Sequence, residues 1–105
     1  MIGDLRSRLG LYVPQDRPDE LGGTQTQWVF LRAFWAKVEP SNLTERRENG
    51  RLAVTQSYKI ILRYRADFPE RARVIWGHRI LRVITSSDPD NRQERLHLIC
   101  EEEQQ

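Results

Sequence analysis

Side chains suited to nucleophilic or metal chemistry are few in this chain, and their spacing does not favour it. Cys100 is the single cysteine, and His78 and His97 are the two histidines. His97 and Cys100 lie three positions apart, so on a β-strand they point to opposite faces and cannot form a nucleophile–base pair. One cysteine and two histidines do not make a zinc-binding pattern. The sequence therefore predicts a core position for Cys100 and no catalytic residue or cofactor.

Two further groups of residues that suggest ligand binding are better explained as turns. Asp88 and Asp90 flank Pro89, and two nearby carboxylates are a possible calcium site. However, Asp followed by Pro is typical of the first two positions of a type I turn, so we expect a turn at residues 88–91. Gly22-Gly23 likewise fits a turn rather than a phosphate-binding loop. Together with Asp16, Pro18 and Asp19, it predicts a loop over residues 15–23. No metal site is predicted.

Arginine is the residue type most able to make specific contacts here. Fifteen of the seventeen basic residues are arginine, although the net charge is only +2. Residues 46–82 hold ten basic side chains against three acidic ones, whereas Glu101, Glu102 and Glu103 follow one another near the end. Guanidinium groups form paired hydrogen bonds with carboxylates and phosphates. The distribution fits contacts with protein subunits or nucleic acid, and solvated strand faces remain the simpler alternative for any single arginine.

Antiparallel β-strands are predicted to position these side chains. In residues 57–65 Tyr58, Ile60, Leu62 and Tyr64 recur with a period of two. Further strands are expected at residues 8–14, 24–38, 73–76, 79–85 and 92–100, with Gly77-His78 as a hairpin turn. Residues 24–38 are long for one strand, so a bend or bulge is expected near Arg32-Ala33, and Pro40 is expected to end the strand.

Residues 41–50 do not fit the strand pattern, and residues 51–55 lead back into the next strand. Asn42, Glu45 and Gly50 have the spacing of helix caps, but about seven residues are too few for a stable isolated helix. We therefore expect a polar, mobile loop that becomes helical only against a partner. The predicted fold class is all-β: one domain over residues 1–105, a small antiparallel β-barrel of about six or seven strands. The barrel has one long extruded loop containing at most a short helix, and residues 101–105 form a frayed tail.

Nearly the whole chain resembles small head–tail joining proteins of tailed phages. The segment that begins at Trp28 and continues with Trp35-Ala36-Lys37-Val38-Glu39-Pro40 is similar to a tryptophan-containing segment of that family. Other matching segments occur in the family's order: Gly3, Leu5, Arg6, Arg8 and Leu9, Gly22-Gly23, Arg63-Tyr64-Arg65, Val74-Ile75-Trp76-Gly77-His78-Arg79-Ile80-Leu81, Ile84, and Asp88-Pro89.

The resemblance implies a structural subunit rather than an enzyme. Such proteins form a ring under the portal or adaptor that closes the DNA-filled head and provides the docking surface for the tail. The implied partners are further copies of the chain, the portal or adaptor protein above, a tail or tail-terminator protein below, and packaged DNA in the channel. The implied location is the virion neck, with assembly in the host cytoplasm.

The resemblance also implies a channel loop, which by position is residues 41–53. The expected gate residues are Thr44, Glu45, Arg46, Arg47, Glu48, Asn49 and Arg51. Separately, Trp76 lies beside the predicted hairpin turn, so we expect it to be partly exposed and to form a possible ring contact with Arg73 and Arg79.

An alternative function is a single-stranded nucleic-acid-binding barrel of the OB or SH3-like kind. Bases stack on exposed aromatic side chains, whereas in small domains aromatics more often fill the core or an interface. The residues in question are Trp28, Trp35, Trp76, Tyr58 and Tyr64. No membrane partner is expected, since no run approaches the ~20 apolar residues of a membrane helix and the start lacks the apolar stretch of a signal peptide.

Overall fold

Six antiparallel strands close into a barrel in a computed structural model, which describes residues 5–89 and 91–103. The strands are β1 (Ser7–Pro18), β2 (Thr24–Glu48), β3 (Arg51–Arg63), β4 (Arg73–Trp76), β5 (Arg79–Ser87) and β6 (Arg95–Glu102). Their order around the barrel is β1-β2-β3-β6-β5-β4. The predicted all-β antiparallel barrel is confirmed. Of the residues used above, Gly3, Asp90 and the last two glutamines lie outside the described residues, as do the side chains of Asn42, Thr44, Arg46, Glu48 and Ala53.

β2 is the longest element, with 25 residues, and it pairs with a different strand in each half. Its first half pairs with β1 from Thr24 to Ala36, and its second half pairs with β3 from Ala36 to Glu48. Ala36 is the one residue in both ladders, opposite Ser7 on one side and Leu62 on the other, and it is fully buried. The barrel is thus organised around a single residue of β2 where two ladders overlap.

Two irregularities bend β2. Leu31 is the extra residue where Leu11 pairs with Arg32 but Tyr12 pairs with Phe30. This bulge lies next to the predicted bend at Arg32-Ala33, which it confirms. The second irregularity lies between Pro40 and Leu43. Pro40 was expected to end the strand, and that expectation was wrong, because a proline is tolerated at a bulge where no ladder donor is needed.

The core is built from alternate residues of every strand. On β6, Leu96, Leu98 and Cys100 are buried, whereas His97 is only half-buried and Ile99 is exposed. The predicted separation of His97 from Cys100 is therefore confirmed. The side chains with almost no exposure are Leu9, Leu11, Ile60, Leu81, Leu98, Val74 and Cys100. The period of two predicted for residues 57–65 holds for Tyr58, Ile60 and Leu62, which are buried, and Tyr64 packs against the core.

Both predicted turns are present. Gly77 has a φ of 62°, which glycine adopts without steric cost at the first position of a two-residue hairpin turn. The backbone N–H of Asn91 donates to the carbonyl of Asp88 at 3.2 Å, and the N–H of Gln93 donates to Asp88 Oδ2 at 2.8 Å. The flanking strands are shifted relative to the prediction, since β5 continues to Ser87 and β6 begins at Arg95.

The acidic end of the chain is part of the sheet. β6 continues through Glu102, and the N–H of Glu103 donates to the carbonyl of Ile80 at 2.9 Å. Three successive ion pairs join this segment to β4 and β5: Glu101 with Arg82 at 3.4 Å, Glu102 with Arg79 at 3.7 Å, and Glu103 with Arg73 at 2.9 Å. The frayed tail predicted from residue 101 is therefore wrong for residues 101–103, because these pairs anchor them.

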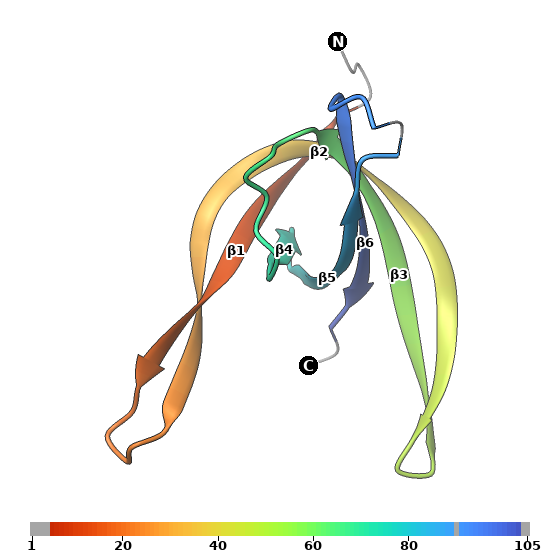
Figure 1. The fold of residues 1–105 in the computed structure, drawn as a ribbon. Helices are drawn as coiled ribbons and strands as arrows, with labels where there is room; N and C mark the ends of the chain where they lie inside the picture. Colours follow the sequence, from red (N-terminus) through yellow and green to blue (C-terminus); the bar gives the residue numbers. More distant parts are fainter. Residues whose placement is uncertain (1–4, 90, 104–105) are drawn as a thin grey trace.

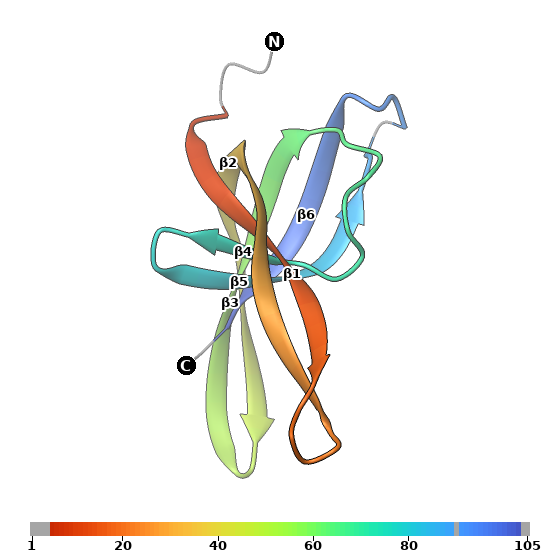
Figure 2. The same cartoon turned by 90° about the vertical axis from the view of Figure 1, so that its left-hand side faces the viewer.

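Two long ribbons extend from the barrel toward the same end of the molecule (Figure 1). One is the β1–β2 ribbon, residues 13–29, and the other is the β2–β3 ribbon, residues 41–56. A view turned by 90° also places both ribbon tips at the same end of the molecule (Figure 2). The molecule measures 50 × 34 × 26 Å, and the ribbons account for its elongated shape.

Alkaline pH should destabilise the barrel through Cys100. Burial raises the pKa of the Cys100 thiol to about 12, against about 8.5 in an unfolded chain. The unfolded state loses this proton first, so the free energy of unfolding should fall between these values by up to roughly 1.4 kcal/mol per pH unit. Urea unfolding from about pH 7 to pH 10.5 measures this slope. Cys100→Ala, although less stable overall, should show a shallower fall, and an equal slope in both proteins would contradict the assignment.

Candidate functional site

The segment predicted as a channel loop is a β-ribbon instead. Residues 43–48 of β2 pair in register with residues 51–56 of β3, from Leu43 opposite Gln56 to Glu48 opposite Arg51. Asn49 and Gly50 connect the strands with φ values of 52° and 76°. Two consecutive positive φ values are the signature of a type I′ turn, whose twist matches that of paired strands. The expectation of an unpaired loop with a possible helix cap at Asn42 was wrong, whereas its extrusion from the barrel is as predicted.

The signal that was missed is the Asn49-Gly50 dipeptide. Asn-Gly is the preferred pair for a type I′ hairpin, because both residues tolerate positive φ. The flanking residues are polar and include good helix formers, so local propensity favours a loop or a helix. Pairing across the ribbon overrides that propensity. Leu52 and Val54 are alternate apolar residues of β3, and this alternation indicates a strand only when the turn at Asn49-Gly50 is recognised.

One face of the β2–β3 ribbon carries exposed apolar side chains. Leu43, Leu52 and Val54 are 67%, 63% and 41% exposed. The register puts Glu45 opposite Val54 and Arg47 opposite Leu52, so all five side chains share one face. On β3 this face is continuous with the barrel interior at Tyr58. The ribbon therefore presents an alternating apolar and charged surface suited to contact with another molecule.

The structure brings the expected gate residues together at the end of this ribbon. Glu45, Arg47, Asn49 and Arg51 are exposed. The backbones of Thr44, Arg46 and Glu48 occupy the alternate ladder positions, opposite Thr55, Ala53 and Arg51. The expected gate residues therefore form the end of a two-stranded ribbon closed by a tight turn.

A second extruded element was not foreseen. Residues 15–23 were expected to form a loop, yet residues 15–18 pair with residues 24–27 and only the tip is a turn. At this tip Asp19 Oδ1 accepts hydrogen bonds from the backbone N–H groups of Leu21 at 2.9 Å and Gly23 at 2.7 Å. Leu21 is 95% exposed. The Asp-Gly-rich composition that suggested a loop in fact builds a closed turn with an apolar side chain at its end.

The three residues expected at a ring contact separate into two groups. Arg79 lies over Trp76, with its Cζ 5.2 Å from the ring centroid, and its Nη1 donates to the hydroxyl of Tyr58 at 2.9 Å. Trp76 is half-buried, consistent with its expected partial exposure. Arg73 instead has its Cζ 4.3 Å from the ring centroid of Trp28. Arg79 also pairs with Glu102 of β6, and Arg73 pairs with Glu103, the residue after β6. Both arginines therefore stabilise the fold.

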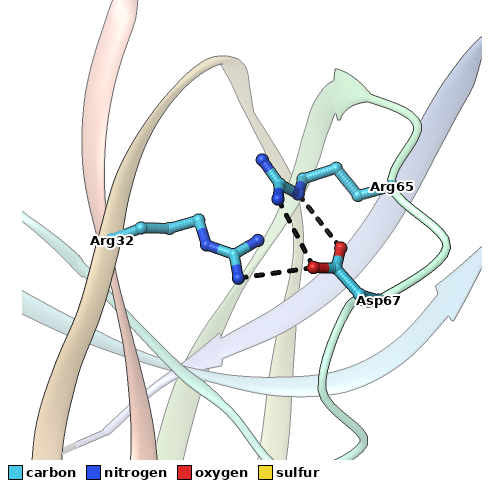
Figure 3. A network of polar contacts seen from close by, with 3 residues as sticks. All are labelled: Arg32, Arg65 and Asp67. Carbon is cyan, nitrogen blue, oxygen red and sulfur yellow. Dashed lines mark hydrogen bonds and ion pairs between the residues drawn. The ribbon is translucent and has the colours of Figure 1, made fainter.

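A three-residue polar network connects β2 with the loop after β3 (Figure 3). Arg65 donates from Nε to Asp67 Oδ1 at 3.1 Å and from Nη2 to Oδ2 at 3.4 Å, and Arg32 Nη2 lies 3.5 Å from Oδ2. Hydrogen bonding from Arg65, with the charges of Arg65 and Arg32, holds the pKa of the Asp67 carboxyl below its usual value despite the opposing effect of desolvation. Arg32 Nη1 is buried and has no hydrogen-bond partner.

Among residues 5–89 and 91–103, no group of three or more histidine, cysteine or acidic side chains is placed to hold a metal ion. The same part of the chain contains no helix long and apolar enough to cross a membrane.

Comparison with known proteins connects this architecture to phage particles. A family model described as phage head completion protein matches residues 1–103. A chain from the virion of a native gene transfer agent particle superimposes with a TM-score of 0.78 at 23% identity, covering 95% of this chain and 96% of that one, which shows a shared fold. Protein SF1141 from Shigella flexneri 2a gives a TM-score of 0.69 at 27% identity, covering 96% and 95%. No curated protein sequence matches the chain.

Replacing Gly50 by alanine should loosen the β2–β3 ribbon without unfolding the barrel. At a φ of 76° a Cβ atom costs roughly 1–2 kcal/mol. Amide hydrogen exchange should therefore speed up about tenfold along residues 43–56 and stay unchanged on β6. Asn49→Gly is the matched control, because glycine accepts the φ of 52° at that position and should keep the ribbon protected. Uniform loss of protection across the barrel would contradict this separation of ribbon from core.

Proposed function

Since the chain belongs to the phage head completion protein family, we propose that it is the ring-forming subunit that closes the DNA-filled head. The family membership gives the protein a structural role in the phage head. In the proposal, several copies form a ring under the portal or adaptor protein, and the opposite surface of the ring docks the tail or a tail-terminator protein. The particle neck is the proposed location, and the host cytoplasm is the proposed site of assembly.

The observation that carries the proposal is a pair of long ribbons on one side of a small closed barrel. A ring repeats one subunit around an axis, so a projecting element of each copy is brought close to the same element of the next. The β2–β3 ribbon has the surface for such contacts, since Leu43, Leu52 and Val54 are exposed beside charged neighbours. In the proposed ring the barrel surrounds the channel and the ribbon is the projecting element directed to its axis.

Contacts between neighbouring ribbons would hold the channel closed but allow it to open. In the proposed ring Glu45 of one copy pairs with Arg47 or Arg51 of the next, and exposed ion pairs of this kind contribute about 0–1 kcal/mol each. Partial burial of the three apolar side chains adds about 1 kcal/mol per side chain. These contributions are small enough for docking of the tail to break the contacts and open the channel. The same arginines are also placed to contact the phosphates of packaged DNA, a contact that salt weakens.

The ring contact proposed at Trp76 uses the exposed edge of that side chain with Arg79 beside it. A half-buried aromatic with an adjacent guanidinium is the type of residue pair that dominates binding energy at protein interfaces. Arg73 contributes from a different surface, over Trp28, so a ring would need two contact areas to use all three residues. Their intramolecular ion pairs keep both arginines in fixed positions before assembly.

Shortening the β2–β3 ribbon should release DNA from heads that lack tails. Replacing residues 45–54 by Asn-Gly makes Thr44 and Thr55 the closing pair and preserves the register of the barrel. We expect the shortened protein to fold and to join the head, because the core is untouched. The measurement is the amount of nuclease-protected genome in purified tailless heads, which should drop relative to heads with the unmodified protein.

The matched control shortens the other ribbon. Replacing residues 16–26 by Asn-Gly makes Gln15 and Gln27 the closing pair and removes a comparable length of chain. If the β2–β3 ribbon is the gate, this control should retain protected DNA. Full DNA retention after shortening the β2–β3 ribbon, in heads shown to contain the variant, would refute the gate.

A further inference from the structure

A notch opens where β2 and β3 separate. The β2–β3 ladder ends at the pair Ala36 and Leu62, after which β2 follows β1 and β3 follows β6. Between the diverging strands lies a cavity of about 580 Å³, bordered by Leu5, Phe34 and Trp35 on one side and by Arg63, Tyr64 and Arg65 on the other. Ligand sites in proteins commonly have volumes in this range.

Within residues 5–89 and 91–103, each strand beside the notch has a ladder partner on one edge only. Residues 33–35 of β2 pair with residues 8–10 of β1, and Arg63 of β3 pairs with Arg95 of β6. The backbone N–H of Tyr64 donates a hydrogen bond to the carbonyl of Glu94, which is also on the β6 side. The two edges that face each other across the notch are therefore open, and open edges of this kind accept an added strand.

The side chains around the notch are basic and aromatic. Trp35 is 52% exposed, and Arg8 lies over its ring with the Cζ 5.3 Å from the centroid. Arg63 and Arg65 line the cavity. Arg32 forms an ion pair with Asp67, which also contacts Arg65. Asp67 already sits as a carboxylate between two guanidinium groups (Figure 3), while Arg32 Nη1 remains buried without a hydrogen bond. Arg8, Arg32, Arg63 and Arg65 thus border this region, and Asp67 contacts two of them, so the surroundings favour further carboxylates.

We propose that this notch binds an extended acidic segment of a partner protein, which adds as a strand between β2 and β3. Backbone amides of the segment pair with the open edges, its acidic side chains contact the arginines, and its apolar side chains lie on Trp35. Protein is favoured over nucleic acid because only a peptide supplies regularly spaced N–H and C=O groups for two strand edges. The proposal does not depend on ring formation or on the gate.

The test uses the full chain and a fluorescein-labelled peptide of alternating glutamate and valine. Fluorescence polarisation should show saturable binding. Trp35→Ala and Arg65→Gln should each weaken it about tenfold, since each removes one contact of the usual size for a charged or aromatic group. Arg17→Gln, at the end of the β1–β2 ribbon, is the matched control and should bind like the unmodified protein. On peptide addition, hydrogen exchange should slow within residues 33–35 and at Arg63 and Arg65, whereas the N–H of Tyr64 already donates to Glu94.

Three further probes separate the proposal from its rivals. A peptide of alternating lysine and valine and one of alternating glutamate and proline should both fail to bind, because the first reverses the charge and the second removes amide donors. Equal binding of the proline peptide would overturn strand addition. Absence of saturable binding by the glutamate–valine peptide, or binding unaffected by Trp35→Ala and Arg65→Gln, would overturn the site. Displacement of the peptide by oligo(dT), with the same dependence on Trp35, would assign the notch to nucleic acid instead.

Discussion

The architecture depends on one strand serving two ladders. β2 pairs with β1 up to Ala36 and with β3 from Ala36 onward, so the two partner strands overlap at one position only. A residue that is buried between two ladders and surrounded by core side chains must be small. Beyond this crossing each half of β2 leaves the barrel with its own partner. The two ribbons, and the notch where β2 and β3 separate, are consequences of this geometry rather than independent features.

The ribbons and the barrel differ in how they are stabilised. The barrel has a shared interior made of leucine, isoleucine and valine side chains and Cys100, whereas the ribbons have two strands each and no enclosed core. An isolated two-stranded hairpin is marginally stable in water. Bulges at Leu31 and after Pro40 mark the places where β2 passes from the barrel into each of the two ribbons. A rigid body with two marginal projections allows a partner to order or displace a ribbon without unfolding the core.

Sequence reasoning recovered what depends on local pattern. The alternation of Tyr58, Ile60 and Leu62, the turn at Asp88, the bend near Arg32 and the core position of Cys100 all follow from neighbouring residues. It missed how far both ribbons extend, because residues 15–23 and 45–51 are mostly polar and lack β-branched side chains, and only cross-strand pairing stabilises these ends. It also placed Arg73 beside Trp76, although Arg73 lies over Trp28. Such partners are set by strand register, which a single sequence does not display.

The distribution of charge changes meaning once the fold is known. Along the chain, Glu101, Glu102 and Glu103 look like an acidic tail opposed to a basic middle. In the structure each of them pairs with an arginine of β4 or β5, which neutralises that part of the basic excess. The remaining excess lies in two places, the end of the β2–β3 ribbon with Arg47 and Arg51, and the notch with its four arginines. Because these regions lie at different places along β2 and β3, contacts at the proposed gate and at the proposed notch site can be made by separate partners.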